Sequence, residues 1–265
     1  MSGTNVTTVS REGQHPIDPF FPPDSMPSVW CPGCGIGTIV YTFVQAVEEM
    51  NAEPDKICVV SGIGCTGKIA EYLNFGSHET TDGNVIAYAA DLATKKQDMK
   101  VVVFTNNADF LVSSAKDFLD IGKKRTNLLV IHFNNIIYCI TENGAIPTTP
   151  FMRASADNDF ELPFNIPHLV KSSGAVYVAR WTPLRAGWLK YSIIDALSKR
   201  ALSVIEVVSP CVVYYTFASK IGDAADQLRF YSDNSVMKQY EPTENLDLRS
   251  QSEVIIGKFV DKKED

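Results

Sequence analysis

Short apolar runs alternate with helical stretches along most of this chain. The runs are continuously apolar and rich in β-branched residues, so the strands that they predict have no polar face. Strands of this kind are typical of a parallel sheet that helices cover on both sides. The pattern therefore predicts an α/β fold with a doubly wound, mostly parallel sheet. The predicted strands are residues 57–60, 101–104, 128–131, 175–178 and 203–208, and the predicted helices are residues 36–50, 68–74, 110–121 and 186–200.

The two ends of the chain depart from this pattern. Residues 1–29 are polar and then rich in proline, which is typical of an extended arm that stays disordered or wraps a partner. Residues 221–265 show weaker periodicity and many charges, so we expect a surface extension or a partner-binding arm there. The sequence thus predicts one α/β domain, residues 30–220, between two appendages.

Composition and charge exclude several classes of function. The chain has 265 residues, 45% of them hydrophobic, which is enough for one full core. Its formal net charge is -7, and its longest basic run is Lys123-Lys124-Arg125, so nucleic-acid binding is not expected. No apolar run approaches the roughly 18 residues of a membrane span, and the first residues lack a signal pattern. We therefore expect a cytoplasmic protein with reduced thiols that does not bind a membrane.

The motif Trp30-Cys31-Pro32-Gly33-Cys34-Gly35 carries the clearest chemistry of the chain. It places two thiols three positions apart on a Pro-Gly turn directly before a predicted helix. Two sulfurs in this arrangement can bind one metal centre. The other four cysteines stand alone in the sequence, so any further ligand must come from a distant position: Cys58, Cys65, Cys139 and Cys211.

Three kinds of cysteine site compete for this motif. A zinc site would need a second close Cys or His pair, which the four histidines do not supply. A thioredoxin-like dithiol would need a core strand before it, where the chain instead carries several prolines. An iron–sulfur cluster accepts ligands from separate loops, and both Cys65 and Cys211 directly follow predicted strands. The pattern favours the cluster, while zinc, a dithiol and a structural role stay open.

Three polar loops follow the predicted strands and are further candidates for binding. Residues 105–109 could place backbone N–H groups against a phosphate, or Asp109 could simply cap a helix. Residues 134–138 carry an Asn-Asn pair whose oxygens suit a hard cation, although such pairs are common in turns. Residues 80–83 offer hydroxyls to a ligand or form an ordinary surface turn. In parallel sheets ligands bind at the carboxyl ends of strands, where these loops fall.

Taken in order, the motifs between Trp30 and Cys211 resemble the β subunit of the 2-oxoacid:ferredoxin oxidoreductases, in particular the type acting on 2-oxoglutarate or branched 2-oxoacids. The resemblance implies a sheet of the thiamine diphosphate-binding type, the pyrophosphate domain. The motifs that carry it are Trp30-Cys31-Pro32-Gly33-Cys34-Gly35, Ser61-Gly62-Ile63-Gly64-Cys65-Thr66-Gly67, Tyr72-Leu73-Asn74-Phe75, Asn134-Asn135-x-Ile137-Tyr138, Pro147-Thr148-Thr149-Pro150, Gly174-Ala175-x-Tyr177-Val178-Ala179-Arg180 and Ser209-Pro210-Cys211.

The resemblance also implies cofactors and the residues that hold them. The cluster would be a 4Fe-4S cluster, and a second site would hold thiamine diphosphate with Mg²⁺. The implied cluster ligands are Cys31, Cys34, Cys65 and Cys211. The implied thiamine diphosphate contacts are Thr66, Thr81, Gly83, Asn107, Ala108, Asp109, Tyr138 and Thr141, and the implied Mg²⁺ ligands are Asn107, Asn135 and Ile137.

The implied reaction is oxidative decarboxylation of a 2-oxoacid to an acyl-CoA, with electrons passing through the cluster to ferredoxin or another carrier. An α-type subunit would supply the pyrimidine-binding domain, the glutamate that activates the cofactor and most substrate contacts. The sequence of this chain therefore identifies neither a catalytic residue nor the substrate. We therefore expect a hetero-oligomer with two-fold symmetry.

The chain departs from the family at the thiamine diphosphate loops. The family's Gly-Asp-Gly-Asp is replaced by Asn106-Asn107-Ala108-Asp109, which removes a carboxylate at a cation ligand. The family's His-Gly-Arg is replaced by Asp82-Gly83-Asn84, and a glycine-rich loop becomes residues 138–144, with Cys139 and Glu142 in place of glycines. Two hypotheses follow: an active oxidoreductase subunit, or a paralogous electron-transfer subunit that keeps the cluster and has lost or remodelled the thiamine site. A cofactor-free α/β protein is the third possibility.

Overall fold

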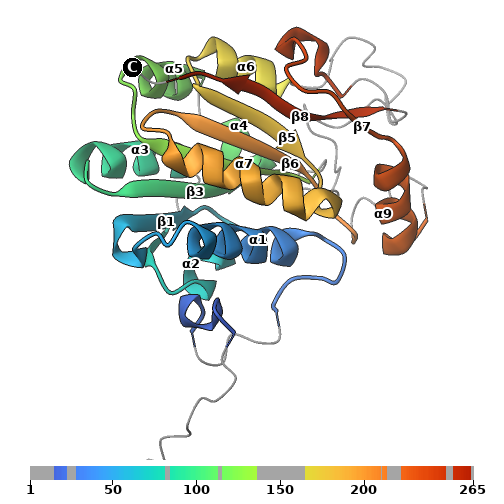
Figure 1. Cartoon of the computed structure of the whole chain (residues 1–265), viewed down its shortest axis with the longest axis horizontal. Coiled ribbons are helices and arrows are strands. Elements are labelled where there is room, and N and C mark those ends of the chain that lie inside the picture. Colours follow the sequence, from blue (N-terminus) through green and yellow to red (C-terminus); the bar gives the residue numbers. More distant parts are fainter. Residues whose placement is uncertain are drawn as a thin grey trace, which may run out of the picture.

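The fold is an α/β sandwich built on one mixed sheet (Figure 1). The structure is a computed structural model. It describes residues 15–22, 28–80, 84–112, 115–135, 165–209, 211–213, 222–248 and 253–263. The strands are β1 (Ile57–Ser61), β2 (Gly76–Glu79), β3 (Lys100–Asn106), β4 (Leu128–Asn134), β5 (Tyr177–Trp181), β6 (Ser203–Val208), β7 (Ser235–Met237) and β8 (Val254–Asp261).

The described strands form an eight-stranded sheet in the order β2-β1-β3-β4-β6-β5-β8-β7. Every neighbouring pair is parallel except β5 and β8, which are antiparallel. The predicted doubly wound, mostly parallel sheet is therefore confirmed. All residues of the inner strands β1, β4, β5 and β6 are buried, which explains why continuous apolar runs predicted most of them.

Helices cover both faces of the sheet. The described helices are α1 (Ile36–Glu49), α2 (Lys68–Tyr72), α3 (Val85–Lys95), α4 (Asn107–Val112), α5 (Ala115–Lys123), α6 (Ile166–Ser172), α7 (Ala186–Ser198) and α9 (Ala224–Asp233), with short 3-10 turns at Asp18–Phe20, Pro54–Lys56, Pro183–Arg185 and Thr243–Asn245. Figure 1 shows α1 and α7 side by side on one face. Along β3, Val102 and Phe104 join the core of that face, whereas Val101 and Val103 join the core on the side of α3, α5 and α6.

Over the predicted helix 110–121 the structure describes two helical segments, α4 up to Val112 and α5 from Ala115. The side-chain oxygen of Asn106 accepts the N–H groups of Ala108 (2.8 Å) and Asp109 (3.1 Å), so α4 begins at Asn107. The capping side chain is therefore Asn106, and the interpretation of Asp109 as an N-cap is wrong. Strand β5 extends to Trp181, beyond the predicted residues 175–178, because Arg180 finds a charged partner in the sheet.

The C-terminal segment belongs to the sheet, in contrast to the extension expected for residues 221–265. Strand β8 pairs with β5, and Val254 and Ile256 are buried in the same core as α1 and α7. Gly257 and the charged residues of β8 interrupt the apolar pattern, which is why the sequence did not indicate a strand there.

Part of the predicted N-terminal arm also packs on its own chain. Ile17 is buried in the core, the ring of Phe20 stacks on Phe75, and the backbone N–H of Asn74 donates to the carbonyl of Phe20 at 2.8 Å. The short segment 15–22 is thus part of the domain. As for membranes, the described helices include none with the length and apolar character of a span.

Candidate metal centre and cofactor pocket

One cavity of about 540 Å³ lies where the loops after β1, β3, β4 and β6 meet. The described residues that line it include the four cysteines proposed as cluster ligands and several residues of the polar loops. The sequence prediction that these motifs converge is therefore supported by the geometry of the fold. The lining residues are Val29, Trp30, Cys31, Cys34, Ile36, Gly64, Cys65, Thr66, Lys68, Asn106, Ala108, Phe133, Asn135, Ser209, Cys211 and Val212.

Hydrogen bonds tie the cysteine loops to one another. The indole N–H of Trp30 donates to the carbonyl of Cys65 at 2.8 Å, which links the Cys31–Cys34 turn to the loop after β1. The Ser209 hydroxyl donates to the carbonyl of Cys34, which links the same turn to the loop after β6. The backbone N–H of Cys211 donates to the carbonyl of Asn135 at 3.2 Å. Hydrogen bonds thus join the Cys31–Cys34 turn to the loops after β1 and β6.

Gly35 allows the turn to approach the loop after β6. Its φ is +83°, in the left-handed region, and a Cβ atom at this position would collide with Pro183 and with the Ser209 hydroxyl. The turn itself is closed by the backbone N–H of Cys34, which donates to the carbonyl of Cys31 at 3.2 Å. Glycine after the second cysteine is therefore a packing requirement, and it fixes where the Cys34 thiol lies.

The four thiols are close enough to influence one another. Burial raises the pKa of the Cys34 thiol, and the neighbouring thiols of Cys31, Cys65 and Cys211 add to that shift. The thiols of Cys31 and Cys65 are exposed, and those of Cys34 and Cys211 are half-buried. By contrast Cys58 is fully buried within β1, so it belongs to the core.

The four cysteines that line the cavity are a donor set of the kind that an iron–sulfur cluster uses. Within the described residues, no three His, Cys, Asp or Glu side chains form a group that could hold one metal ion. The four cysteines line a cavity of about 540 Å³, which has room for several atoms. Thiolate sulfur is the usual ligand of iron–sulfur clusters. Cys31, Cys34, Cys65 and Cys211 would be the residues that hold one.

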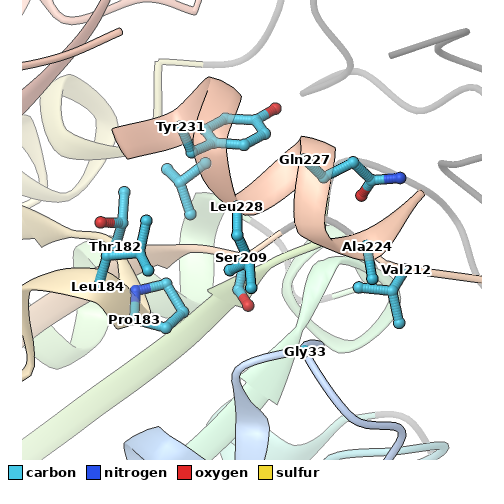
Figure 2. Close-up of a pocket in the computed structure, with 11 residues that line it drawn as sticks. Gly33, Thr182, Pro183, Leu184, Ser209, Val212, Ala224, Gln227, Leu228 and Tyr231 are labelled. Carbon is cyan, nitrogen blue, oxygen red and sulfur yellow. The ribbon is translucent and has the colours of Figure 1, made fainter. Parts of the chain in front are cut away.

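Helix α9 covers the outer side of the Cys31–Cys34 turn. A Cβ atom placed on Gly33 would lie 3.4 Å from the Cβ of Ala224 and 3.6 Å from Val212, which is van der Waals distance, so α9 packs directly on the turn. Figure 2 shows Ala224 beside Val212, and Leu228 pointing from α9 toward Ser209. A cavity of about 20 Å³ lies between α9 and the loops, which is room for one water molecule. The C-terminal segment therefore packs against one side of the turn, while Cys31, Pro32 and Gly33 stay exposed.

The residues around α4 hold the Cys65 loop. The side-chain amide of Asn106 donates to the carbonyl of Ile63 at 2.8 Å and to the Thr66 hydroxyl at 2.9 Å. The Asp109 carboxylate accepts the backbone N–H of Ile63 at 3.3 Å, and it lies so close to Gly62 that any side chain there would collide with it. Burial raises the pKa of Asp109 to about 6, against the opposing effect of the N–H groups of Ile63 and Asn106. These contacts position the loop.

The side chain of Asn107 is buried in a network of hydrogen bonds. Its amide nitrogen donates to the Oδ1 atoms of Asn135 (2.8 Å) and Asn134 (3.3 Å). Its oxygen lies 3.0 Å from Nε2 of His132. Burial lowers the pKa of His132 to about 4, although nearby Glu206 opposes the shift, so the ring is neutral at pH 7. The oxygen of Asn107 thus faces a core histidine.

This arrangement does not fit the predicted Mg²⁺ site. Asn107 and Asn135, two of the three predicted ligands, are hydrogen-bonded directly to each other, and Asn107 offers its nitrogen rather than its oxygen. A cation binds oxygen atoms, and the N–H group of an amide repels it. The third predicted ligand, Ile137, lies outside the described residues. The described ligands would have to rearrange before they could hold a cation.

Besides Asn107 and Asp109, the predicted thiamine diphosphate contacts that the structure describes are Ala108 and Thr66. Ala108 lines the cavity and is buried, while Thr66 is buried with its hydroxyl 3.3 Å from the carbonyl of Ile63. The remaining contacts lie outside the described residues and stay predictions: Thr81, Gly83, Tyr138 and Thr141.

A row of polar residues crosses the sheet and was not predicted. The strand registers pair Thr105 with His132, His132 with Glu206, and Glu206 with Arg180. All four side chains are buried, and the guanidinium Nε of Arg180 donates to Glu206 at 2.6 Å. The amide of Asn134 donates to the other oxygen of Glu206 at 2.7 Å. The row is therefore connected to Asn107 and to the edge of the cavity.

The chain is similar to known proteins over most of its length. The family model described as "Thiamine pyrophosphate enzyme, C-terminal TPP binding domain" matches residues 62–207. A relative named 2-oxoglutarate synthase subunit KorB, from Methanocaldococcus jannaschii, is 33% identical over 251 residues, which are 93% of this chain and 92% of the relative. The β subunit of 2-oxoacid:ferredoxin oxidoreductase 1 from Aeropyrum pernix is 29% identical over 85% of this chain and 70% of its own length.

A solved structure has a similar fold over nearly the whole chain. It is described as the 2-oxoglutarate:ferredoxin oxidoreductase from Magnetococcus marinus with 2-oxoglutarate, coenzyme A and succinyl-CoA bound. The TM-score is 0.77 at 20% sequence identity, and the match covers 96% of this chain and 87% of the other.

Proposed function

This chain belongs to the β subunits of the 2-oxoacid:ferredoxin oxidoreductases, and we propose that it is the subunit that carries a 4Fe-4S cluster for electron transfer in such a complex. The observation that carries the proposal is the convergence of Cys31, Cys34, Cys65 and Cys211 on one cavity, with their loops joined by hydrogen bonds. The cluster supplies one-electron transfer when it is bound. The chain would supply the four sulfur ligands.

The reaction of the complex would be the oxidative decarboxylation of a 2-oxoacid to an acyl-CoA. The relatives are named as subunits of 2-oxoglutarate synthase and of 2-oxoacid:ferredoxin oxidoreductases, which supports this class of substrate and a ferredoxin-type electron acceptor. An α-type subunit would contribute the pyrimidine-binding domain and most contacts with the 2-oxoacid. We propose a hetero-oligomer in which α and β subunits are doubled by two-fold symmetry.

A specific observation favours a second candidate function. Asn107 and Asn135 are hydrogen-bonded to each other where the family resemblance places cation ligands. This supports a paralogous electron-transfer subunit whose thiamine diphosphate site has been lost or remodelled. In the first candidate the chain holds the diphosphate of the cofactor through Mg²⁺, and in the second it does not. Both candidates share the cluster, so it does not discriminate between them.

The composition of the native complex tests the proposal. The complex is purified under anoxic conditions, and its iron, sulfide, magnesium and thiamine are measured. We expect about four irons and four sulfides for each copy of this chain. A colourless complex that contains one zinc for each chain would contradict the cluster.

Calorimetry of the same complex separates the two candidate functions. Micromolar or tighter binding of thiamine diphosphate with Mg²⁺ would support an active site on this chain. The absence of binding, with the iron content unchanged, would support the electron-transfer subunit. A preparation without iron, sulfide or thiamine would leave the cofactor-free protein.

A further inference from the structure

The hydrogen bonds that lead to Asn107 have a fixed direction. The guanidinium of Arg180 can only donate, and the Glu206 carboxylate with which it forms an ion pair can only accept. Glu206 therefore receives the amide nitrogen of Asn134, at 2.7 Å. The Oδ1 atom of Asn134 must then point the other way, and it accepts from the nitrogen of Asn107 at 3.3 Å. An ion pair within the sheet thus orients two amides in series.

The same logic continues to the histidine. Because its nitrogen faces Asn134 and Asn135, Asn107 turns its oxygen toward Nε2 of His132, at 3.0 Å. A neutral ring that donates from Nε2 has a lone pair on Nδ1, and this atom lies 3.1 Å from the Thr105 hydroxyl, which can donate to it. Both ring nitrogens of His132, both ends of the Asn107 amide and both oxygens of Glu206 then have a partner. The assignment predicts the Nε2–H tautomer of His132.

We propose that Glu206 is a positioning residue that turns the oxygen of Asn107 away from Asn135, so that an amide–amide hydrogen bond replaces a divalent cation at the edge of the cavity. This inference deepens the second candidate function and rests on it. It names the physical cause of the remodelling, which is an acceptor on strand β6 that lies far from Asn107 in the sequence.

The energetics support the hydrogen bond over a cation. If the amide of Asn107 were flipped, its nitrogen would face the N–H of His132, and its oxygen would face the Oδ1 atom of Asn134. Two donors would then oppose each other at one end and two acceptors at the other, all in a buried site. A cation bound beside Asn135 could relieve only the repulsion between the side-chain oxygens of Asn107 and Asn135. Glu206 therefore disfavours the Asn107 orientation that metal binding needs, in which the side-chain oxygen of Asn107 faces Asn135.

The test replaces Glu206 by a residue of nearly the same shape and should reverse the donor and acceptor of each hydrogen bond from Asn134 to His132. In Glu206→Gln the new amide must turn its oxygen to Arg180, which leaves its nitrogen facing Asn134. The amides of Asn134 and Asn107 then flip, and His132 must accept at Nε2, so its proton moves to Nδ1. We expect ¹⁵N NMR of the full-length chain, labelled on histidine, to show the Nε2–H tautomer before the substitution and the Nδ1–H tautomer after it. The His132 signal is assigned by its loss in His132→Gln.

A second readout uses Mn²⁺ alone as the probe. With the oxygen of Asn107 turned to Asn135, we expect Glu206→Gln to bind Mn²⁺ about 10- to 100-fold more tightly, the range in which outer groups change metal affinity. Electron paramagnetic resonance titration measures this. Glu253→Gln is the matched control, because it also removes one carboxylate but from an exposed pair with Lys238. The control should change neither the tautomer nor Mn²⁺ binding.

The outcomes separate this proposal from the cluster. An Nδ1–H tautomer in the unaltered chain would overturn the proposal, as would a Glu206→Gln chain that keeps the original tautomer or gains no Mn²⁺ affinity. If Glu206→Gln does not fold, the tautomer of the unaltered chain decides alone. Iron and sulfide are measured on the same samples, so failure of the cluster is recorded independently of the amide series.

Discussion

At the scale of single residues, the buried pair Arg180–Glu206 has a cost that the fold must offset. Each side chain is 1% exposed. Burial removes the solvation of both charges, and this loss is costly unless each charge has a partner. Nη1 and Nη2 of Arg180 have no hydrogen-bond partner among the described residues. Glu206 is therefore the principal compensation for the buried guanidinium. Such pairs often add little net stability, but breaking one from a single side is expensive.

Removing one partner of the ion pair should destabilise the protein more than removing both. We expect Glu206→Ala to lower the free energy of unfolding by about 3–5 kcal/mol, because Arg180 is left as an uncompensated buried charge. The double substitution Arg180→Met with Glu206→Leu removes both charges and should cost much less than Glu206→Ala alone. Urea denaturation measures both. A double variant as unstable as Glu206→Ala would show that the polar row as a whole is needed for the fold.

The cysteines separate into ligands and a core residue, and substitution should reproduce this division. We expect Cys31→Ser, Cys65→Ser and Cys211→Ser each to abolish the visible absorption and the iron of the anoxic protein, because serine oxygen is a poor replacement for a cluster thiolate. Cys58→Ser is the control, since Cys58 is buried within β1 and should leave the iron content unchanged. Loss of iron in Cys58→Ser alone would contradict the proposed ligand set.

The sequence predicted which of these residues meet, but not how their atoms are oriented. Motif order placed Asn107 and Asn135 in one site, and their side chains are in fact 2.8 Å apart. The direction of the Asn107 amide depends on His132 and Glu206, which lie on other strands. The predicted strands ended at residue 131 on β4 and at residue 178 on β5, where the apolar runs end. The strands continue because the polar residues that follow pair with one another.

At the scale of elements, charges hold β8 against the rest of the domain. Lys258 lies 3.1 Å from Asp195 of α7 and 2.7 Å from Asp261, and Lys199 lies 2.7 Å from Asp261. Lys199, Lys258 and Asp261 are only 16–24% exposed, so their charges are screened less than those of exposed pairs, whereas Asp195 is 44% exposed. The antiparallel strand is thus fixed to β5 by its backbone and to the end of α7 by ion pairs.

Asp261 should make a pH-dependent contribution to stability. Burial alone would raise its pKa, but hydrogen bonds from Lys199 and Lys258 outweigh burial and hold the pKa below the ordinary value of 3.8. A lowered pKa means that the stabilisation is present above pH 3.8 and is lost as the pH falls through the lower folded-state pKa. We expect Asp261→Asn to cost about 1–3 kcal/mol at pH 7, from the loss of charged hydrogen bonds.

Chemical denaturation at several pH values checks this prediction. The difference between Asp261→Asn and the unaltered protein should shrink below pH 3.8, where the carboxyl of the unaltered protein also becomes neutral. Asp98→Asn is the control, because Asp98 forms only an exposed pair with Lys56 at 3.8 Å and should change stability little. A cost that stays the same at acid pH would mean that the charge of Asp261 is unimportant.

The sequence indicated the inner strands much better than the edges of the sheet. Every residue of strands β1, β4 and β6, and every residue of β3 before Asn106, is buried because helices cover both faces of the sheet, and most of these residues are apolar. The edge strand β2 reads Gly-Ser-His-Glu and has no apolar run at all, and β8 is interrupted by Gly257, whose φ is +149°. At such positions pairing with a neighbouring strand decides the structure, and local sequence does not reveal it.

At the scale of the whole molecule, the cysteine pocket extends beyond the segment that defines the enzyme family. The family model matches residues 62–207. Two of the proposed cluster ligands, on the Cys31–Cys34 turn, precede this segment, and Cys211 and α9 follow it. The sheet likewise gains β7 and β8 from residues after the match. The parts that distinguish this chain from a simple thiamine-binding domain are therefore those that build the proposed electron-transfer site.

Assembly with an α-type subunit is the prediction that belongs to this scale. The matched segment is a C-terminal TPP binding domain, and the family resemblance implies that another chain supplies the pyrimidine-binding domain. We expect native mass spectrometry of the co-expressed proteins to show equal numbers of the two subunits, with a mass that indicates two of each. The chain expressed alone should not reduce ferredoxin with any 2-oxoacid, because the family resemblance implies that the α-type subunit would supply the substrate contacts.

Cys65→Ser in the co-expressed complex separates assembly from electron transfer. Cys65 is exposed in the cavity, so its replacement removes one sulfur without disturbing the core. We expect the complex to keep its subunit ratio, because the sheet and its helices do not depend on that thiol, while ferredoxin reduction falls to background. Full activity from a stable monomer of this chain would contradict the partner. Full activity of the Cys65→Ser complex would contradict the path through the cluster, because electrons would then reach ferredoxin without the fourth sulfur ligand.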